Sequence, residues 1–236
     1  SASVRLLLAQ SPPIMSSSEI RRIGVLVSGR GSNLRALLAE DFSPARIVVV
    51  ISDKEKAGAL DYARYAGVEA VFLSPKAYVD RATFDAAVTQ KLLDHRVDFI
   101  CLSGYMRLVT AGFVAAWRDR MINIHPSLLP SFKGLHAQAQ ALAAGVRLAG
   151  ATVHVVTEEC DSGSILGQAV VPVLASDNEA TLSARILAVE HRLYPAVVRG
   201  LVDQKITIEA GRVCYHNAIV DVGGLGLLSL GTEVCS

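Results

Sequence analysis

Residues 47–51 read Ile47-Val48-Val49-Val50-Ile51, five β-branched residues in succession. A strand that is apolar at every position, and not only at alternate ones, is typical of a parallel sheet covered on both faces. Working outward, apolar runs at residues 23–28 and 97–102 also read as buried strands, and segments of helical composition separate them. This alternation of strand and helix predicts an α/β fold with a doubly wound, mostly parallel sheet in the N-terminal half.

The second half of the chain changes character. Residues 150–157 and 166–173 read as two strands joined by a turn-rich segment, and such a pair would extend the sheet in an antiparallel direction. Residues 179–200 carry apolar side chains on one helical face and predict one long helix. Residues 205–213 read as a terminal hairpin. The other predicted helices are 32–40, 57–66, 80–95 and 110–117, the last capped by Thr110, and the other predicted strands are 70–73 and 121–124.

The composition is that of a well-buried globular protein: 51% of the residues are apolar, 19% are charged and the formal net charge is +1. This balance gives no bulk basic field for holding nucleic acid, and no apolar run approaches the roughly 20 residues of a membrane span. The cysteines show no C-x-x-C pair and no zinc spacing, so we expect reduced thiols, no metal and a cytoplasmic location. The four cysteines are Cys101, Cys160, Cys214 and Cys235.

We expect three parts along the chain. Residues 1–19 do not fit the rest, and their apolar stretch is shorter than the roughly 7–15 residues of a signal-peptide core, so we interpret them as a disordered leader or a cloning remnant. Residues 20–216 contain no linker that would split them and are expected to form a single domain. Residues 217–236 are expected to form a C-terminal tail, either mobile or packed on a neighbour.

The segment Asn123-Ile124-His125-Pro126-Ser127-Leu128-Leu129-Pro130 carries the strongest functional signal. In an extended segment residues i and i+2 point to the same side, so Asn123 and His125 should project together. Pro126 disfavours helix at the residue before it and holds His125 extended. A carboxamide donor beside a titratable donor on a stiff backbone suits an oxyanion that forms during acyl transfer. The alternative is a structural turn with a core histidine.

The segment Ser28-Gly29-Arg30-Gly31-Ser32-Asn33 follows the first predicted strand, at the edge where open parallel sheets bind ligands. Small residues there let backbone N–H groups approach an anion, and Ser32 and Asn33 add side-chain donors. The segment has neither the G-x-G-x-x-G spacing nor a G-K-[ST] sequence, which favours a single phosphate over a dinucleotide or a triphosphate. The alternative is a tight turn and helix cap without a ligand.

Three further features bear on the site. Asp161 lies in the turn-rich segment between the two C-terminal strands, where a carboxylate near His125 would fix the imidazole ring. The alternative is an ordinary turn aspartate before Ser162-Gly163. Thr152 and His154 share one face of the preceding strand. His154 could face the same site or be a satisfied, half-buried histidine, and we favour the second. Residues 104–109 follow a strand and could line a flat heteroaromatic pocket, or simply connect strand to helix.

Three segments together resemble the phosphoribosylglycinamide formyltransferase family over roughly residues 23–213. They are residues 27–34, residues 123–136, and residues 150–156 with Asp161-Ser162-Gly163. The resemblance implies a Rossmann-like formyltransferase fold. It implies transfer of a formyl group from 10-formyltetrahydrofolate, as co-substrate, to the amino group of N1-(5-phosphoribosyl)glycinamide in purine synthesis, without a metal. We therefore expect small-molecule partners, neither nucleic acid nor membrane, and a monomer or homodimer.

The resemblance also assigns roles to residues. It implies that His125 is a general acid, that Asp161 tunes it, and that Asn123 shares the catalytic site. Thr152 stands where some relatives have serine, and Leu129-Pro130 is the expected cis bond. The ribonucleotide would be bound by Gly31, Ser32, Asn33 and Glu190, and the folate by Arg81, Met106, Arg107, Leu108, Val109 and Asn123.

Three alternatives stay open at this point. Formyltetrahydrofolate deformylase shares the Asn, His and Asp residues but transfers the formyl group to water; it usually carries an extra N-terminal regulatory domain, for which residues 1–19 leave no room. Methionyl-tRNA formyltransferase is disfavoured by the near-neutral charge and by the lack of a C-terminal tRNA-binding domain. A non-catalytic nucleotide-binding module would keep the phosphate loop but have no use for His125 and Asp161.

Overall fold

The structure is a computed structural model that describes residues 19–216. The predicted C-terminal tail, and all but the last residue of the predicted leader, lie outside the described residues. The chain divides into two units, with the division between Met121 and Ile122. The single-domain boundaries at residues 20 and 216 stay a prediction.

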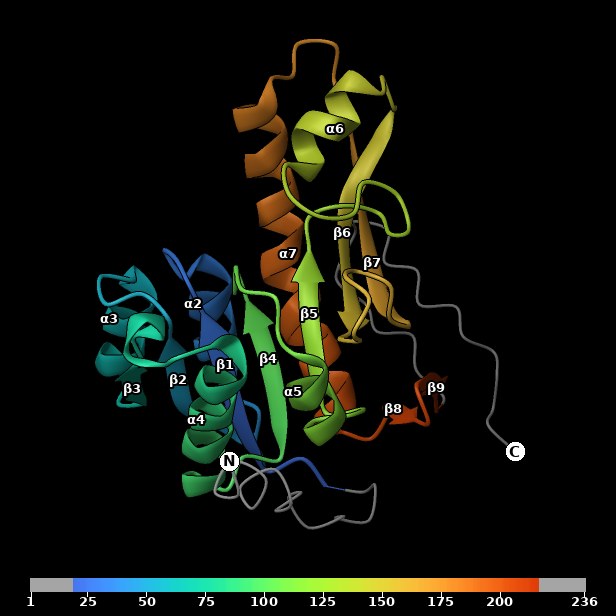
Figure 1. The fold of residues 1–236 in the computed structure, drawn as a ribbon. Helices are drawn as coiled ribbons and strands as arrows, with labels where there is room; N and C mark the ends of the chain where they lie inside the picture. The colour runs from blue at the N-terminus through green and yellow to red at the C-terminus, as the bar shows by residue number, and fades with distance from the viewer. Residues whose placement is uncertain (1–18, 217–236) are drawn as a thin grey trace. The chain divides into compact units, whose positions relative to one another are not determined.

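The first unit is built on parallel strands: β1 (Arg22–Val27), β2 (Arg46–Ser52), β3 (Glu69–Phe72) and β4 (Phe99–Ser103). They lie in the order β3-β2-β1-β4 (Figure 1). Every residue of β4 is buried, as are five of the six residues of β1 and the second half of β2. This is the burial of a sheet covered on both faces, as the unbroken apolar runs predict.

Helices cover both faces of this sheet. They are α2 (Ser32–Leu38), α3 (Gly58–Tyr65), the short 3-10 helix η1 (Pro75–Ala77), α4 (Arg81–Asp94) and α5 (Ala111–Ala116). The chain runs outward from β1 to β2 and β3 and then returns to β4, so right-handed crossovers place α2 and α3 on one face and α4 on the other. Asp80 caps α4 through a capping box with Thr83, and Thr110 caps α5 as predicted.

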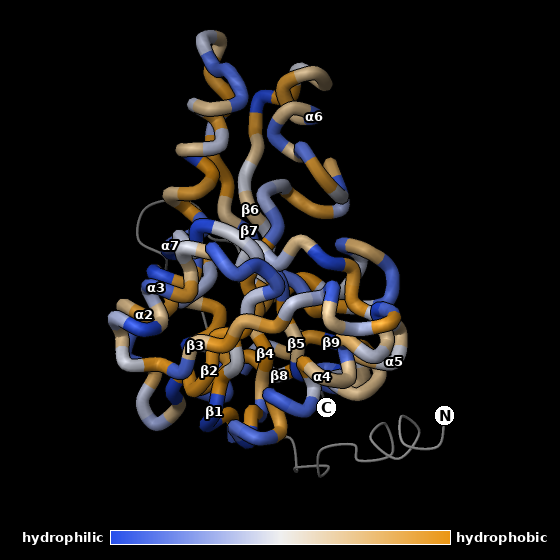
Figure 2. The backbone as a smooth tube through the Cα atoms, turned by 60° about the vertical axis from the view of Figure 1, so that its left-hand side comes forward, coloured by the Kyte–Doolittle hydropathy of each residue, from blue (hydrophilic) through white to orange (hydrophobic). Residues whose placement is uncertain are grey.

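The core of the first unit lies between the sheet and these helices. Leu34 and Leu37 of α2 are buried, and so are Phe84, Val88 and Leu92 of α4. Figure 2 shows hydrophobic residues gathered along the strands of this sheet, while the connecting turns are mostly hydrophilic. Apolar burial of this kind stabilises the unit by about 25 cal/mol per Å² of surface removed from water, and it fixes where the ends of the strands lie.

The second unit combines an antiparallel sheet with one long helix. Its strands β5 (Met121–His125), β6 (Leu148–Val155) and β7 (Ile165–Pro172) lie in the order β5-β6-β7. The helix α7 (Glu179–Val202) begins at a capping box between Asn178 and Thr181, and it runs beside β6 and β7 (Figure 1). The short helix α6 (Ala137–Ala143) and the hairpin of β8 (Ile206–Glu209) and β9 (Arg212–Tyr215) complete the described part of this unit.

The predicted α/β class, with a parallel N-terminal sheet and an antiparallel extension, is confirmed. Predicted element ends differ from the observed ends by at most two residues, for instance residues 179–200 against α7. Two elements were not predicted. In α6, the sequence Ala137-Gln138-Ala139-Gln140-Ala141-Leu142-Ala143 has no large apolar stripe to mark a helix, and η1 spans only three residues.

The thiols agree with the expectation only in part. Cys101 is buried and free, and Cys160 is exposed and free, but Cys214 is disulfide-bonded. The prediction of reduced thiols is therefore wrong for Cys214. Within residues 19–216, no helix is both long enough and apolar enough to cross a membrane. No group of three or more His, Cys, Asp or Glu side chains in that range could hold a metal ion.

Candidate active site

Asn123 and His125 lie on the same face of β5, as their spacing predicts. The antiparallel register pairs Asn123 with His154 and His125 with Thr152, both on β6. Directly opposed residues of neighbouring strands project to the same face of a sheet, so these four side chains gather there. His125 and His154 are only 6% and 2% exposed, and Thr152 is fully buried. The sheet itself therefore brings two imidazoles and a carboxamide together.

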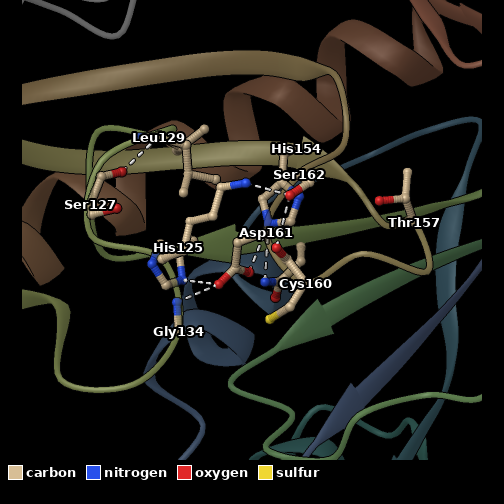
Figure 3. Close-up of polar contacts among 12 residues, drawn as sticks. His125, Ser127, Leu129, Gly134, His154, Thr157, Cys160, Asp161 and Ser162 are labelled. Carbon is tan, nitrogen blue, oxygen red and sulfur yellow. Dashed lines mark hydrogen bonds and ion pairs between the residues drawn. The ribbon is translucent and has the colours of Figure 1, made fainter.

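Asp161 joins this group from the loop between β6 and β7 (Figure 3). Its Oδ2 atom lies 3.4 Å from His125 Nδ1, and its Oδ1 atom lies 3.6 Å from His154 Nε2. The backbone N–H of Gly134 donates to Oδ2 at 2.8 Å. Only 8% of the Asp161 side chain is exposed. One carboxylate thus bridges two imidazoles in a site that is largely shielded from water.

The backbone of the loop aims this carboxylate. Asp161 has a φ of +50°, in the left-handed region that aspartate adopts more readily than most residues. The loop is closed at its base by a hydrogen bond from the Val155 amide to the Ser164 carbonyl at 2.9 Å. A Cβ atom on Gly163 would overlap the Val155 carbonyl, so this close approach requires glycine. The Asp161-Ser162-Gly163 turn is therefore both a turn and a part of the site.

The partners of the two imidazoles determine where their hydrogens lie. His125 Nε2 is 3.0 Å from the Phe132 carbonyl oxygen, and His154 Nδ1 is 3.0 Å from the Val155 carbonyl oxygen. Because a carbonyl only accepts, both of these nitrogens carry hydrogen. His154 Nε2 lies 3.3 Å from Asn123 Nδ2 as well as near Asp161. It can accept from Asn123 or, when protonated, donate to Asp161, but it cannot do both at once.

The surroundings of Asp161 keep its carboxyl group ionised. A hydrogen bond from His154 is the largest cause that lowers the pKa of Asp161. The Gly134 amide and the charges of His125 and His154 lower this pKa further, while burial works in the opposite direction. The net result is a pKa well below the ordinary value of 3.8. At neutral pH the site therefore holds a negative charge beside His125.

Thr152 holds the loop that follows β5. Its hydroxyl donates to the Ser127 carbonyl at 2.7 Å and accepts from the Leu129 amide at 3.0 Å. Gln168 on β7 donates to the same hydroxyl at 3.0 Å and to the Leu129 carbonyl at 2.9 Å. The Leu129-Pro130 peptide is cis, the bond expected from the resemblance. Buried side-chain bonds, and not the prolines alone, therefore fix the chain beyond His125.

In the first unit, the predicted phosphate loop runs from the end of β1 into α2. Gly31 precedes α2 with a φ of +82°, and a Cβ atom there would lie 2.6 Å from the Cα atom of Ala59. Glycine is required at this position on both counts. The Ala59 amide also donates to the Gly29 carbonyl at 3.2 Å. Ser32 and Asn33 begin α2 and are partly exposed.

Residues 104–109 lie at the end of β4, where backbone bonds tie them to the end of β1. The Ser28 amide donates to the Gly104 carbonyl at 3.2 Å, and the Met106 amide donates to the Ser28 hydroxyl at 2.9 Å. Met106 and Leu108 are 70% and 64% exposed. The remaining predicted folate residues of this unit are Arg107, whose guanidinium lies 4.7 Å from the Phe84 ring centroid, the partly exposed Val109, and Arg81, the exposed first residue of α4.

Sequence reasoning missed part of the site. The expectation that His154 lies outside it is wrong, because this buried ring contacts both Asn123 and Asp161. Its shared face with Thr152 was the available signal, but only the β5–β6 register shows what that face meets. No sequence pattern marks Gln168 or Gly134. Glu190 is buried on α7 in the same unit, and its assignment to the ribonucleotide stays a prediction.

This geometry defines a class of protein: an α/β protein with amide and imidazole donors and a buried carboxylate gathered on one strand face. The chain belongs to the formyl transferase family, which it matches over residues 21–198. The resemblance seen in the sequence is thereby confirmed.

Named relatives agree with this family. The chain is 43% identical to the trifunctional purine biosynthetic protein adenosine-3 of Bos taurus over 198 residues. The aligned region covers 82% of this chain but 20% of that protein. It thus spans about a fifth of the length of this relative. It is 37% identical over 185 residues to phosphoribosylglycinamide formyltransferase of Bacillus subtilis, covering 77% of the chain and 95% of the relative.

Solved structures are similar along most of the chain. Glycinamide ribonucleotide transformylase 1 from Symbiobacterium toebii is 47% identical, with a TM-score of 0.80, covering 87% of this chain and 99% of that one. A formyltetrahydrofolate deformylase from Pseudomonas syringae is 27% identical, with a TM-score of 0.76, covering 84% of this chain and 67% of that one.

Proposed function

We propose that this protein transfers a formyl group from 10-formyltetrahydrofolate to the amino group of N1-(5-phosphoribosyl)glycinamide. The observation that carries the proposal is the buried group of Asn123, His125, His154 and Asp161, found in a member of the formyl transferase family. The Bacillus subtilis relative, of which the chain covers 95%, is named phosphoribosylglycinamide formyltransferase. We accordingly propose that the protein acts in purine synthesis in the cell.

The first step places negative charge on the formyl oxygen. The substrate amine attacks the formyl carbon, a C–N bond forms, and the carbonyl oxygen becomes an oxyanion. Asn123 Nδ2 carries two N–H groups, so it can donate one of them to the oxyanion whether or not His154 Nε2 is protonated. The N–H group at His125 Nε2 donates to the Phe132 carbonyl in the free protein, and we assign it as the second donor to the oxyanion once substrate is bound. One oxyanion donor is typically worth about 2.7–4 kcal/mol of barrier.

The second step breaks the bond between the formyl carbon and N10 of the folate. The attacking nitrogen loses a proton and N10 gains one, so the transfer is balanced without any other reactant. The ionised Asp161, 3.4 Å from His125 Nδ1, stabilises positive charge on that ring while the oxyanion exists. We assign the proton transfer to His125 as general acid and to water beside Asp161.

The residues that bind the substrates are assigned as the resemblance to the family implies. The phosphate is given to Gly31, Ser32 and Asn33, supported by the glycine-dependent turn at the start of α2, and Glu190 is assigned to the same ribonucleotide. The folate is given to residues 106–109, Arg81 and Asn123, since exposed apolar side chains such as Met106 suit a flat heteroaromatic ring. Small molecules as the only partners, a monomer or homodimer, and a cytoplasmic location belong to the same proposal.

The competing activity is hydrolysis of 10-formyltetrahydrofolate. It is favoured by the similarity to a deformylase structure, but the identity there is 27% against 47% for the glycinamide ribonucleotide transformylase. The higher identity supports an amine, and not water, as the formyl acceptor.

The test is to measure consumption of 10-formyltetrahydrofolate by the purified chain with and without the ribonucleotide. Formyl transfer predicts equal amounts of formylated ribonucleotide and tetrahydrofolate, and no folate consumption when the ribonucleotide is omitted. Equal consumption without the ribonucleotide would establish hydrolysis instead. A lack of turnover with both the ribonucleotide and water as acceptor would favour the non-catalytic nucleotide-binding module.

A further inference from the structure

Lys133 contacts the loop that carries Asp161. Its ammonium group donates to the Ser162 hydroxyl and lies 3.8 Å from a carboxylate oxygen of Glu159. The Ser162 hydroxyl in turn donates to the Cys160 carbonyl at 3.0 Å, and Figure 3 shows Ser162 and Cys160 beside Asp161. Lys133 therefore holds the loop on both sides of the carboxylate that faces His125.

The segment that bears Lys133 also contacts His125. The Phe132 carbonyl accepts from His125 Nε2 at 3.0 Å, and the Gly134 amide donates to Asp161 Oδ2 at 2.8 Å. The segment is attached to α6, because Gln140 Nε2 donates to the Leu135 carbonyl at 2.9 Å and to the Lys133 carbonyl at 3.3 Å. Three consecutive residues thus link the imidazole, the carboxylate and the loop.

Apart from the bond that Asp161 accepts from the Gly134 amide, the side-chain hydrogen bonds within the loop do not attach it to this segment. The Thr157 hydroxyl donates to the Glu159 carbonyl, and the Ser162 hydroxyl donates to the Cys160 carbonyl, both within the loop. Glu159 is 80% exposed as a side chain, so its ion pair with Lys133 is weak by itself. The bond from Lys133 to Ser162 is therefore the side-chain attachment next to Asp161 that joins the loop to residues 132–134.

We propose that Lys133 is a positioning residue that fastens the Asp161 loop to residues 132–134 and so keeps the carboxylate against His125. The inference rests on the proposed function for its kinetic readout, but the fastening itself is a property of the free protein. A fastened loop spends more time in the arrangement that supports transfer, so Lys133 acts on kcat through Asp161 and not through substrate binding.

Three variants separate fastening from charge. Ser162→Ala removes the hydrogen-bond acceptor and keeps the Lys133 charge, Lys133→Met removes the donor together with its charge, and Lys133→Arg keeps a charged donor. We expect kcat to fall about fivefold in the first two variants, the effect of losing one hydrogen bond, with KM for both substrates unchanged. Lys133→Arg should recover most of kcat. Lys205→Met, which removes an ion pair with Asp203 at 3.4 Å, is the matched control.

The free thiol of Cys160 reports on the loop without substrates. Its modification by a thiol reagent, followed by mass spectrometry of the Cys160 peptide, should be several times faster in Ser162→Ala. Burial raises the pKa of this thiol, Asp161 raises it further, and Lys133 lowers it. Loss of the Lys133 charge alone would therefore slow the reaction, whereas Ser162→Ala leaves that charge in place. Because Ser162→Ala also removes the Ser162 bond to the Cys160 carbonyl, faster modification in Lys133→Met as well, against the effect of its lost charge, assigns the loosening to the Lys133 attachment.

The results decide whether the contact between Lys133 and Ser162 holds the Asp161 loop in place or has no effect on it. Lower kcat, unchanged KM and faster Cys160 modification in Ser162→Ala, with recovery in Lys133→Arg, support fastening. Unchanged kcat and unchanged modification in both Ser162→Ala and Lys133→Met overturn it, as does an equal loss of kcat in Lys205→Met. If the chain transfers no formyl group at all, the proposed function fails, and the modification rates still test the fastening on their own.

Discussion

The two units hold their predicted functional residues by different means. In the second unit, side chains position other side chains: Thr152, His154 and Asp161 each bond to a neighbouring side chain in a buried network. In the first unit, backbone geometry provides the site, through the left-handed Gly31 and the amide and carbonyl bonds around residue 28, while Met106 stays exposed.

This difference matches two kinds of task. A reaction centre gains from donors and charges that are fixed before the substrate arrives, because no reorganisation is then needed as charge develops. A binding loop can leave apolar side chains exposed, because the ligand itself covers them and completes the contacts. The comparison therefore separates residues whose loss should affect turnover from residues whose loss should affect binding.

The largest expected effect is in the side-chain network. His125→Ala and Asp161→Ala should each lower kcat by about 10²–10⁴-fold, the range for general acid–base groups, and Asn123→Ala by about 10²–10³-fold, the cost of one oxyanion donor. Initial rates at saturating substrate measure this, and circular dichroism checks that each variant is folded. Near-normal turnover in all three variants would contradict the assignment of these residues to the active site. It would also contradict the proposed division between residues for turnover in the second unit and residues for binding in the first.

Thr152→Val tests whether the network is also structural. The substitution keeps the shape but leaves the Leu129 amide, the Ser127 carbonyl and the Gln168 amide without their buried partner. We expect the free energy of unfolding to fall by about 2–3 kcal/mol, measured by urea denaturation. Thr157→Val is the control, because this exposed hydroxyl donates only to the Glu159 carbonyl. Equal losses in both variants would contradict a special role for Thr152.

Gly31→Ala tests the backbone-built loop of the first unit. Alanine would have to adopt a φ of +82° against Ala59, which costs about 1–2 kcal/mol in backbone energy alone. We expect lower stability together with a raised KM for the ribonucleotide. Gly29→Ala is the matched control, since a Cβ atom there would meet nothing within 4 Å. The loop assignment is contradicted if the two variants have the same KM.

The smallest expected effect is the pH dependence of the contribution that Asp161 makes to the free energy of unfolding. Because its folded-state pKa lies below the unfolded value of about 3.9, the ionised carboxylate stabilises the fold above that pH. This contribution is lost as pH falls through the folded-state pKa. Asp161→Asn should lower the free energy of unfolding by about 1 kcal/mol at neutral pH, and the two proteins should converge in acid. A difference that grows toward low pH would have the wrong sign.

Local patterns predicted most of the fold and half of the site. The unbroken run at residues 47–51 identified a doubly covered parallel strand, and the i, i+2 spacing identified Asn123 and His125 as partners, because both rules depend only on neighbours in the chain. The role of His154 was missed because its partners lie on β5 and in the β6–β7 loop, and only strand register brings them together.

The sequence by itself determined the alternation of strands and helices, the extended Asn123-Ile124-His125 segment, the glycine-dependent turn before α2 and the family. These depend on residue propensities, periodicity and motif spacing, which act over a few positions. Only the tertiary structure decided that Asp161 bridges His125 and His154, that Thr152 and Gln168 hold the loop beyond His125, and that Lys133 reaches Ser162. Those contacts join residues 7 to 39 positions apart, and their geometry depends on the pairing of β5, β6 and β7.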